Sequence, residues 1–318
     1  MKLIAVIPAF NEEQNIANVI KNIPRKISGI KEIKVLVMDD NSRDRTAETA
    51  KSAGADFVIK NKQNLGLGKN FKKGIETALK LKADIIVNID ADNQFNPRDI
   101  PKLIQPILDN EADMVTCSRF LNPQLTKNMP FAKKWGNRRF TNLISRITNQ
   151  KFTDTQCGFR AYSKEAALRL NLQGRFTYTQ EVFIDLAEKG IKIKEIPLEV
   201  NYFRERKSNI SGKLGKYGLK SIAIIARATR DTQPLTFFGV PGAIIFLLGI
   251  IGAGFSFWYW LTHLMTTPVR QLFNVSVFFL IFGLSLGVLA LLADMLKTLK
   301  ANQEEILYRL KKKELEMR

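Results

Sequence analysis

The stretch "ADIIVNIDADNQF", residues 83–95, decides the fold. It begins as a short apolar run and ends by presenting Asp90, Asp92 and Gln94 at every second position. Alternate side chains of an extended segment share one face, so three oxygen-bearing groups can hold one object together. Hard oxygen ligands in this small number suit Mg²⁺ or Mn²⁺, which take further ligands from a bound phosphate. The alternative, a loop acid that caps the following helix, suits Asn96 before Pro97 better than it suits either aspartate.

Four further apolar runs in the first 120 residues have the length and pattern of strands buried on both faces. They cover residues 2–10, 32–40, 55–59 and 112–117, and helical patterns cover 12–23, 43–53, 69–81 and 97–110. This alternation predicts an α/β fold built on a mostly parallel, doubly wound sheet. Ligands of such sheets lie beyond the carboxyl ends of the strands. Those ends carry "PAFNEE", "MDDNSRD" and "DADNQF", so the acidic residues are expected to converge on one site.

The composition limits the chemistry of that site. The 318 residues include 49 basic and 30 acidic side chains, a formal charge of +19, which favours anionic partners. Only one histidine is present, His263, so histidine-based triads and histidine-rich metal sites are excluded. Two cysteines, Cys117 and Cys157, cannot form a disulfide framework for a chain of this length, which favours a reducing compartment. Cys157 is expected to be a small buried residue rather than a nucleophile.

Two apolar segments near the C-terminus, 237–261 and 272–296, have about the length that a membrane-spanning helix needs. The first contains no charged residue and ends in "FWYWL", where interfacial aromatic residues are expected. Buried core helices are the alternative, but core helices of this length without a polar face are unusual. Basic residues flank the pair on its outer ends, so both termini are expected in the cytoplasm. The opening stretch turns acidic too soon for a signal peptide.

Two basic segments are expected to lie at the membrane surface. Residues 127–151 contain seven basic side chains and no acidic one, with apolar residues at the spacing of one helix face. Residues 213–231 carry a basic stripe at helical spacing, typical of an amphipathic helix at the headgroup level. An ordinary solvated helix packed on its own domain is the alternative for both. The expected division is a site-bearing domain over 1–212, the interface helix over 213–231, the two spans, and a charged helical tail over 297–318.

Five ordered motifs carry a resemblance that covers essentially the whole chain: "VIPAFNE", "MDDNSRDRT", "NLGLGKN", "DADNQF" and "DTQCGFRAY". With the basic segments and two spans that follow, the chain resembles the inverting family-2 glycosyltransferases. Within that family it is similar to the polyprenyl-phosphate hexose synthases, such as dolichol-phosphate mannose synthase and the bactoprenol glucosyltransferases. The resemblance implies a GT-A nucleotide-binding fold, a Mg²⁺ or Mn²⁺ ion, and transfer of one hexose to a polyprenyl or dolichyl phosphate with inversion. GDP-mannose and UDP-glucose are both compatible as the nucleotide-sugar donor.

The resemblance also implies roles for particular residues. Those expected to cradle the nucleoside are Pro8, Phe10, Glu12, Val37 and Asp39, and those at the metal and diphosphate are Asp90, Ala91, Asp92 and Gln94. Asp40, beside Asp39, can accept a hydrogen bond from a base or a ribose. Arg119 is expected to contact phosphate, and Arg204 with Arg206 to close over the donor. The chain departs from the family there, because Asn209 stands where a lysine is common, and Phe10 replaces a common tyrosine.

The acceptor accounts for the positive charge. A lipid monophosphate has a second pKa of about 6, so it is largely dianionic at neutral pH and needs no strong general base. It needs positioning and partial screening of its charge instead. Residues expected to grip it are Lys133, Lys134, Arg138 and Arg139, and the resemblance aligns Lys133 and Asn137 with the acceptor. Asp154 and Glu181 are expected to orient sugar hydroxyls or the acceptor, with Asp154 favoured, and the expected catalytic set is Asp92, Asp154, Arg119 and Glu181.

Several alternatives fit parts of the pattern. A processive polysaccharide synthase shares the fold, but the Q-x-x-R-W motif that such enzymes usually carry does not occur in the sequence. A nucleotidyltransferase would gain nothing from a membrane hairpin, and a nucleic-acid binder would be awkwardly placed beside one. A transferase with another lipid or polysaccharide acceptor, and an inactive membrane scaffold, stay open as alternatives. The expected location is a cell membrane, or the endoplasmic reticulum membrane in a eukaryote, and homo-oligomer formation is left open.

Overall fold

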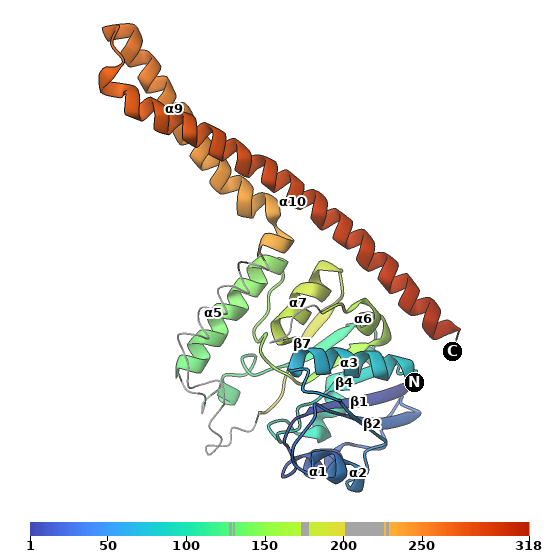
Figure 1. The fold of residues 1–318 in the computed structure, drawn as a ribbon. Helices are drawn as coiled ribbons and strands as arrows, with labels where there is room; N and C mark the ends of the chain where they lie inside the picture. The colour runs from blue at the N-terminus through green and yellow to red at the C-terminus, as the bar shows by residue number, and fades with distance from the viewer. Residues whose placement is uncertain (127–128, 130, 173–177, 201–225, 227–228, 318) are drawn as a thin grey trace. The chain divides into compact units, whose positions relative to one another are not determined.

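The computed structural model describes residues 1–126, 129, 131–172, 178–200, 226 and 229–317, with only the backbone of residues 132 and 133 (Figure 1). The chain divides into two compact units. One consists of Met1–Arg206 together with Leu307–Arg318, and the other of Lys207–Ile306. The expected interface helix over 213–231 and the basic pair Arg204 and Arg206 lie almost wholly outside the described residues.

The first unit is built on a seven-stranded sheet with the order β3-β2-β1-β4-β6-β5-β7. Its strands are β1 (Lys2–Ala9), β2 (Glu32–Asp39), β3 (Phe57–Lys60), β4 (Ile85–Asn88), β5 (Met114–Ser118), β6 (Arg160–Ser163) and β7 (Ile193–Pro197). Every pairing is parallel except those of β6, which runs antiparallel to both β4 and β5. The five predicted strands are therefore confirmed, and β6 and β7 are additions that the apolar runs did not indicate.

Helices cover both faces of this sheet (Figure 1). They are α1 (Ile16–Asn22), α2 (Thr46–Ser52), α3 (Leu67–Lys80), α4 (Ile100–Leu108), α5 (Phe131–Thr148), α6 (Lys164–Arg169) and α7 (Tyr178–Glu188). Successive residues of β1 alternate between two cores: Leu3 packs with α1 and α4, whereas Ile4 packs with α3, α6 and α7. Asn96 caps the turn before α4 by accepting from the Arg98 amide at 3.1 Å, with Pro97 at the first position, as predicted. The α/β fold with a doubly wound sheet is confirmed.

The second unit holds a hairpin of two long helices, α9 (Val240–His263) and the part of α10 (Arg270–Glu316) that runs up to Ile306. Each contains a window apolar enough to cross a membrane, with mean hydropathy 2.2 and 2.6, and only 11% and 17% of these windows is buried. Helices this exposed do not fit the alternative of a soluble protein's core. The two helices approach each other closely at small residues. A Cβ atom at Gly283 of α10 would lie only 2.6 Å from the Phe246 backbone nitrogen of α9, so a larger residue would not fit there.

The charged tail is the last part of α10, so it continues the second apolar segment without a break. Its end, Leu307–Arg318, belongs to the first unit. There the Tyr308 hydroxyl donates to Glu165 Oε2 at 3.0 Å, and the Arg169 guanidinium lies 4.3 Å from the Tyr308 ring centroid. Tyr308 and Leu315 also pack against the core cluster to which α3, α6 and α7 contribute. The predicted tail is helical, and it is docked on α6 through these side chains.

Candidate active site

The carboxyl end of β4 carries the aspartates that the opening stretch predicts. Asp90, Asp92 and Gln94 are all partly exposed there. The chain leaves the strand after Asn88, and residues 91–94 form a turn in which Asn93 adopts a φ of 62°. The Gln94 amide donates to Asp92 Oδ1 at 3.1 Å within this turn. The expectation of a common strand face beyond Asp90 is therefore wrong, because a left-handed residue breaks the alternation on which it depends.

The surroundings of Asp90 disfavour the charged form of its carboxyl group. Burial, followed by the charges of Asp92 and Glu12, raises the pKa of Asp90 to about 7, and the nearby Arg160 opposes that rise. Among the described residues no three carboxylate, thiol or imidazole groups form a metal cage by themselves. A dication bound here would therefore take further oxygen ligands from an amide, water or phosphate.

Gly158, in the loop before β6, makes room for the Asp90 side chain. A Cβ atom at Gly158 would lie 3.1 Å from Asp90 Cγ and would collide with its Oδ2. The Gly158 carbonyl accepts from Asn88 Nδ2 at 2.9 Å, and Asn88 also donates to the Tyr178 hydroxyl at 3.0 Å. The glycine of the "DTQCGFRAY" motif thus has a steric reason.

The ends of β1 and β2 carry most of the residues expected at the nucleoside. Pro8, Val37 and Asp39 are buried there, whereas Phe10 is 45% exposed and can present its ring to a base. Asp39 Oδ1 accepts from the Ser42 amide at 3.0 Å, and Lys60 Nζ lies 3.9 Å from Asp39 Oδ2. That Oδ2 atom is buried without a hydrogen-bond partner in the described part of the chain. It could therefore accept a hydrogen bond from a bound ligand.

Asp40 does not fit the role that the sequence indicated. Its Oδ1 accepts from Asn61 Nδ2 at 2.9 Å and from the Leu65 amide at 2.8 Å. Its Oδ2 accepts from the Gly66 amide at 2.8 Å. The Asp40 side chain is only 3% exposed, and it holds the "NLGLGKN" loop that leads into α3. The expected contact of Asp40 with a base or ribose is therefore replaced by a role in fixing this loop.

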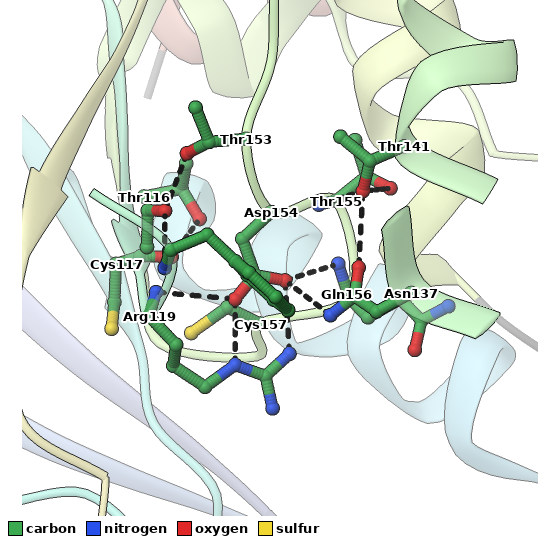
Figure 2. A network of polar contacts seen from close by, with 12 residues as sticks. Thr116, Cys117, Arg119, Asn137, Thr141, Thr153, Asp154, Thr155, Gln156 and Cys157 are labelled. Carbon is green, nitrogen blue, oxygen red and sulfur yellow. Dashed lines mark hydrogen bonds and ion pairs between the residues drawn. The ribbon is translucent and has the colours of Figure 1, made fainter. Parts of the chain in front are cut away.

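A buried polar network surrounds Asp154 (Figure 2). Arg119 Nε donates to Asp154 Oδ2 at 2.6 Å, and Arg119 Nη2 donates to Oδ1 at 2.9 Å. Asn137 Nδ2 and the Gln156 amide donate to the same Oδ1 at 3.0 and 3.1 Å. Burial would raise the pKa of Asp154, but the hydrogen bond and charge of Arg119 outweigh it and hold this pKa below the ordinary value. Asp154 is therefore a stable anion and a weak proton acceptor.

The expected acceptor residues separate onto two sides of α5. Asn137 is 2% exposed, and its Oδ1 accepts from Thr141 Oγ1 at 3.0 Å. Its amide is thus used inside the protein, which corrects the expectation of a direct contact with the acceptor phosphate. Arg138 is exposed and Lys134 is partly exposed, so these two are available to an acceptor. The Lys133 side chain lies outside the described residues.

Glu181 occupies the first turn of α7, where it is partly exposed. Two residues missed by the sequence reasoning support the same region. Arg160 is fully buried and donates to the carbonyls of Cys157 and Thr179 at 2.8 and 2.7 Å. Its position inside the "DTQCGFRAY" motif could have identified it as a residue of this region. Glu195 on β7 accepts from the Asp154 amide at 2.8 Å, and no sequence pattern indicated it.

Residues 4–170 match the family model described as glycosyl transferase family 2. The chain belongs to glycosyl transferase family 2. It is 33% identical over 216 residues to the UDP-N-acetylglucosamine–dolichyl-phosphate N-acetylglucosaminyltransferase of Methanococcus voltae, covering 62% of this chain and 84% of that protein. It is 30% identical over 250 residues to the dolichol-phosphate mannosyltransferase of Pyrococcus furiosus, and this match covers 76% of this chain and 68% of that protein. These relatives confirm the resemblance to polyprenyl-phosphate glycosyltransferases.

A solved structure supports the fold of this glycosyltransferase. The chain superimposes on glucosyl-3-phosphoglycerate synthase from Mycobacterium tuberculosis, solved with Mn²⁺, UDP and phosphoglyceric acid, with a TM-score of 0.53. The two proteins share 22% identity, and the match covers 72% of this chain and 77% of the other. The expected GT-A fold is thereby confirmed.

Proposed function

We propose that this glycosyltransferase moves one hexose from a nucleotide-sugar to a polyprenyl or dolichyl phosphate, with inversion at the sugar. The observation that carries the proposal is the pair of aspartates, Asp90 and Asp92, at the carboxyl end of β4, beside the nucleoside pocket of β1 and β2. Such a junction is where open α/β sheets bind nucleotides. The names of the two relatives support a dolichyl phosphate as the acceptor.

The donor end fits a divalent cation, Mg²⁺ or Mn²⁺. Burial, followed by the charges of Asp92 and Glu12, raises the pKa of Asp90, and a dication between Asp90 and Asp92 would favour the charged form of both. Asp90, Asp92 and Gln94 would hold it, with oxygens of the diphosphate completing the shell. When bound, the ion would neutralise the charge that builds on the leaving diphosphate.

The acceptor end needs an oriented nucleophile rather than a base. A phosphate oxygen of the lipid attacks the anomeric carbon from the face opposite the leaving diphosphate, so the configuration inverts. This oxygen is already ionised at neutral pH, since the second pKa of a phosphomonoester is about 6. Asp154 fits this chemistry because its low pKa and its pairing with Arg119 suit it to orientation rather than proton removal.

The membrane supplies the acceptor. The two apolar helices would anchor the chain in the bilayer with both termini in the cytoplasm. On α5, Phe131 and Trp135 are 81% and 55% exposed, beside the basic residues Lys134 and Arg138. The Arg139 guanidinium lies 5.2 Å from the Trp135 ring centroid. Exposed aromatic rings among basic groups suit a surface that meets lipid headgroups.

The test is a transfer assay with purified protein in detergent, offered polyprenyl phosphate and a panel of UDP- and GDP-hexoses, with UDP-N-acetylhexosamines included. Mass spectrometry of the lipid should show addition of one sugar from one donor. Addition of many sugars would favour a processive synthase, and transfer only to another lipid would favour a different acceptor. Absence of transfer from every donor, with nucleotide bound normally, would overturn the proposal.

A further inference from the structure

We propose that Glu195 on β7 is a positioning residue for the transfer reaction, because it fixes the main chain from which Asp154 orients Arg119 and Asn137. This inference rests on the proposed function and assigns a residue to it that no sequence motif contains. Glu195 Oε1 accepts from the Asp154 amide at 2.8 Å. Glu195 Oε2 accepts from the Thr153 amide at 2.8 Å and from the Thr153 hydroxyl at 3.0 Å.

The sheet register explains why Glu195 can reach this loop. β7 is parallel to β5, with Glu195 opposite Thr116. β5 ends at Ser118, and the next residue is Arg119. The Ser118 hydroxyl lies 2.5 Å from the Thr153 hydroxyl, so the loop is attached to β5 as well as to β7. One carboxylate thus holds the loop in register with the strand that delivers Arg119.

A carboxylate is the group that this geometry requires. Two successive amides and a hydroxyl need three acceptor positions on two oxygens, which a glutamate offers and a glutamine does not. The arrangement has an electrostatic cost, since burial and then the charge of Asp154 act to raise the pKa of Glu195, against the hydrogen bonds that it accepts. A neutral side chain would avoid this cost, but it would lose one or more of the three hydrogen bonds that hold Thr153 and Asp154. We take these hydrogen bonds to be the reason for a carboxylate at this position.

Displacement of the loop that contains Thr153 and Asp154 would also move Arg119 and Asn137, the two side chains that donate to Asp154. The Asp154 carboxylate accepts from Arg119 on one side and from Asn137 of α5 on the other. The Thr155 amide donates to Thr141 of α5 at 3.3 Å, which ties the same loop to the same helix. In contrast, Asp39 ends β2 and Asp90 follows β4, so these two donor residues stand on strands that Glu195 does not contact. A shift of the loop is therefore expected to lower kcat more than donor affinity.

The test compares Glu195→Gln with Glu111→Gln, a control whose glutamate pairs with Lys194 at the surface. Binding of Mn²⁺-UDP and Mn²⁺-GDP by calorimetry gives the number of competent sites, and kcat is expressed per site. Glu195→Gln should lower kcat on the order of 10- to 100-fold with the donor KM within about 3-fold. The control should match the wild type. An unchanged kcat would overturn the proposal, as would loss of nucleotide binding together with activity, because Glu195 would then be a folding residue.

A double-mutant cycle with Asp154→Asn tests whether Glu195 acts through Asp154. In the Asp154→Asn background, Glu195→Gln should lower kcat by less than about 3-fold, because residues that act as one unit are not additive. Full multiplication of the two effects would contradict the proposal. If the wild-type protein itself transfers no sugar to polyprenyl phosphate, the proposed function fails, which is distinct from failure of the role of Glu195.

Discussion

Asp154 and Arg119 form a buried, bidentate ion pair whose closest atoms, Oδ2 and Nε, lie 2.6 Å apart. The pair joins the loop before β6 to the end of β5, and Asn137 connects it to α5. Its two side chains are 0% and 8% exposed, so neither charge can be satisfied by water if the other is removed. The pair therefore holds the loop before β6 against the end of β5 and keeps Asp154 ionised.

Asp154→Leu alone should destabilise the protein by about 3 to 5 kcal/mol, because it leaves the Arg119 charge buried and unpaired. The double variant Asp154→Leu with Arg119→Met should recover most of this stability and none of the activity. Chemical denaturation of the purified protein measures the stability of each variant, and the transfer assay measures its activity. A double variant no more stable than the single one would contradict this account of the pair.

The pair should not titrate in the working pH range. The pKa of Asp154 is lower in the folded protein than in the unfolded chain. Its contribution to stability is therefore present above the unfolded pKa of about 3.9 and is lost only as pH falls through the lower folded pKa. Wild type and the double variant should differ in stability by a constant amount between pH 5 and 8. A difference that changes steeply near neutrality would contradict the assignment.

Metal binding should depend on pH through Asp90. In the metal-free protein its pKa is raised to about 7, so the folded state holds a proton that the unfolded chain releases. The contribution of Asp90 to stability without metal should therefore fall as pH rises from about 4 to 7. Mn²⁺ must displace that proton, so its affinity should weaken about tenfold per unit below pH 7. Calorimetric titration with Mn²⁺ and UDP at pH 5.5, 6.5 and 7.5 measures this, and a pH-independent affinity would argue against Asp90 as a ligand.

Gly158→Ala should abolish most transfer, because the new Cβ would force the Asp90 carboxylate out of its position. Gly136→Ala is the matched control, since nothing lies within 4 Å of a Cβ at Gly136. Thermal unfolding of both variants shows whether the chain still folds. If Gly158→Ala keeps wild-type Mn²⁺ affinity and kcat, then the position of Asp90 does not matter for the reaction.

Charge reversal on the exposed side of α5 should affect the acceptor. Arg138→Glu together with Lys134→Glu should raise the KM for polyprenyl phosphate by about tenfold or more, with the donor KM unchanged. Arg146→Glu is the control, an exposed basic residue on the same helix. The effect should shrink as ionic strength rises. An equal loss in the control would indicate general membrane attraction instead of an acceptor site.

Sequence reasoning found the parts of the fold that local pattern encodes. The strand of Lys2–Ala9 and the turn at Asn96 could be read directly because burial and capping leave local signatures. The strand β6 is only Arg160–Ser163 and is inserted antiparallel between β4 and β5, which no period in the sequence indicates. Asn137 was placed at the acceptor because the resemblance aligns it there, yet its partner Asp154 is 17 residues away in the chain. Glu195 could not be predicted either, because its contact with the loop depends on the pairing of β7 with β5, which joins residues far apart in the sequence.

The measurement that tests the central claim most directly is sugar transfer by Asp92→Asn, compared with wild type and with wild type in excess chelator. Polyprenyl phosphate and the active nucleotide-sugar are supplied, and the lipid product is quantified by mass. The account predicts single-sugar product from the wild type and a loss of at least about 100-fold both in the variant and in chelator, with the variant still recovered in the membrane fraction. Wild-type rates in Asp92→Asn, or in chelator, would contradict the claim that these aspartates serve the reaction by holding a metal ion.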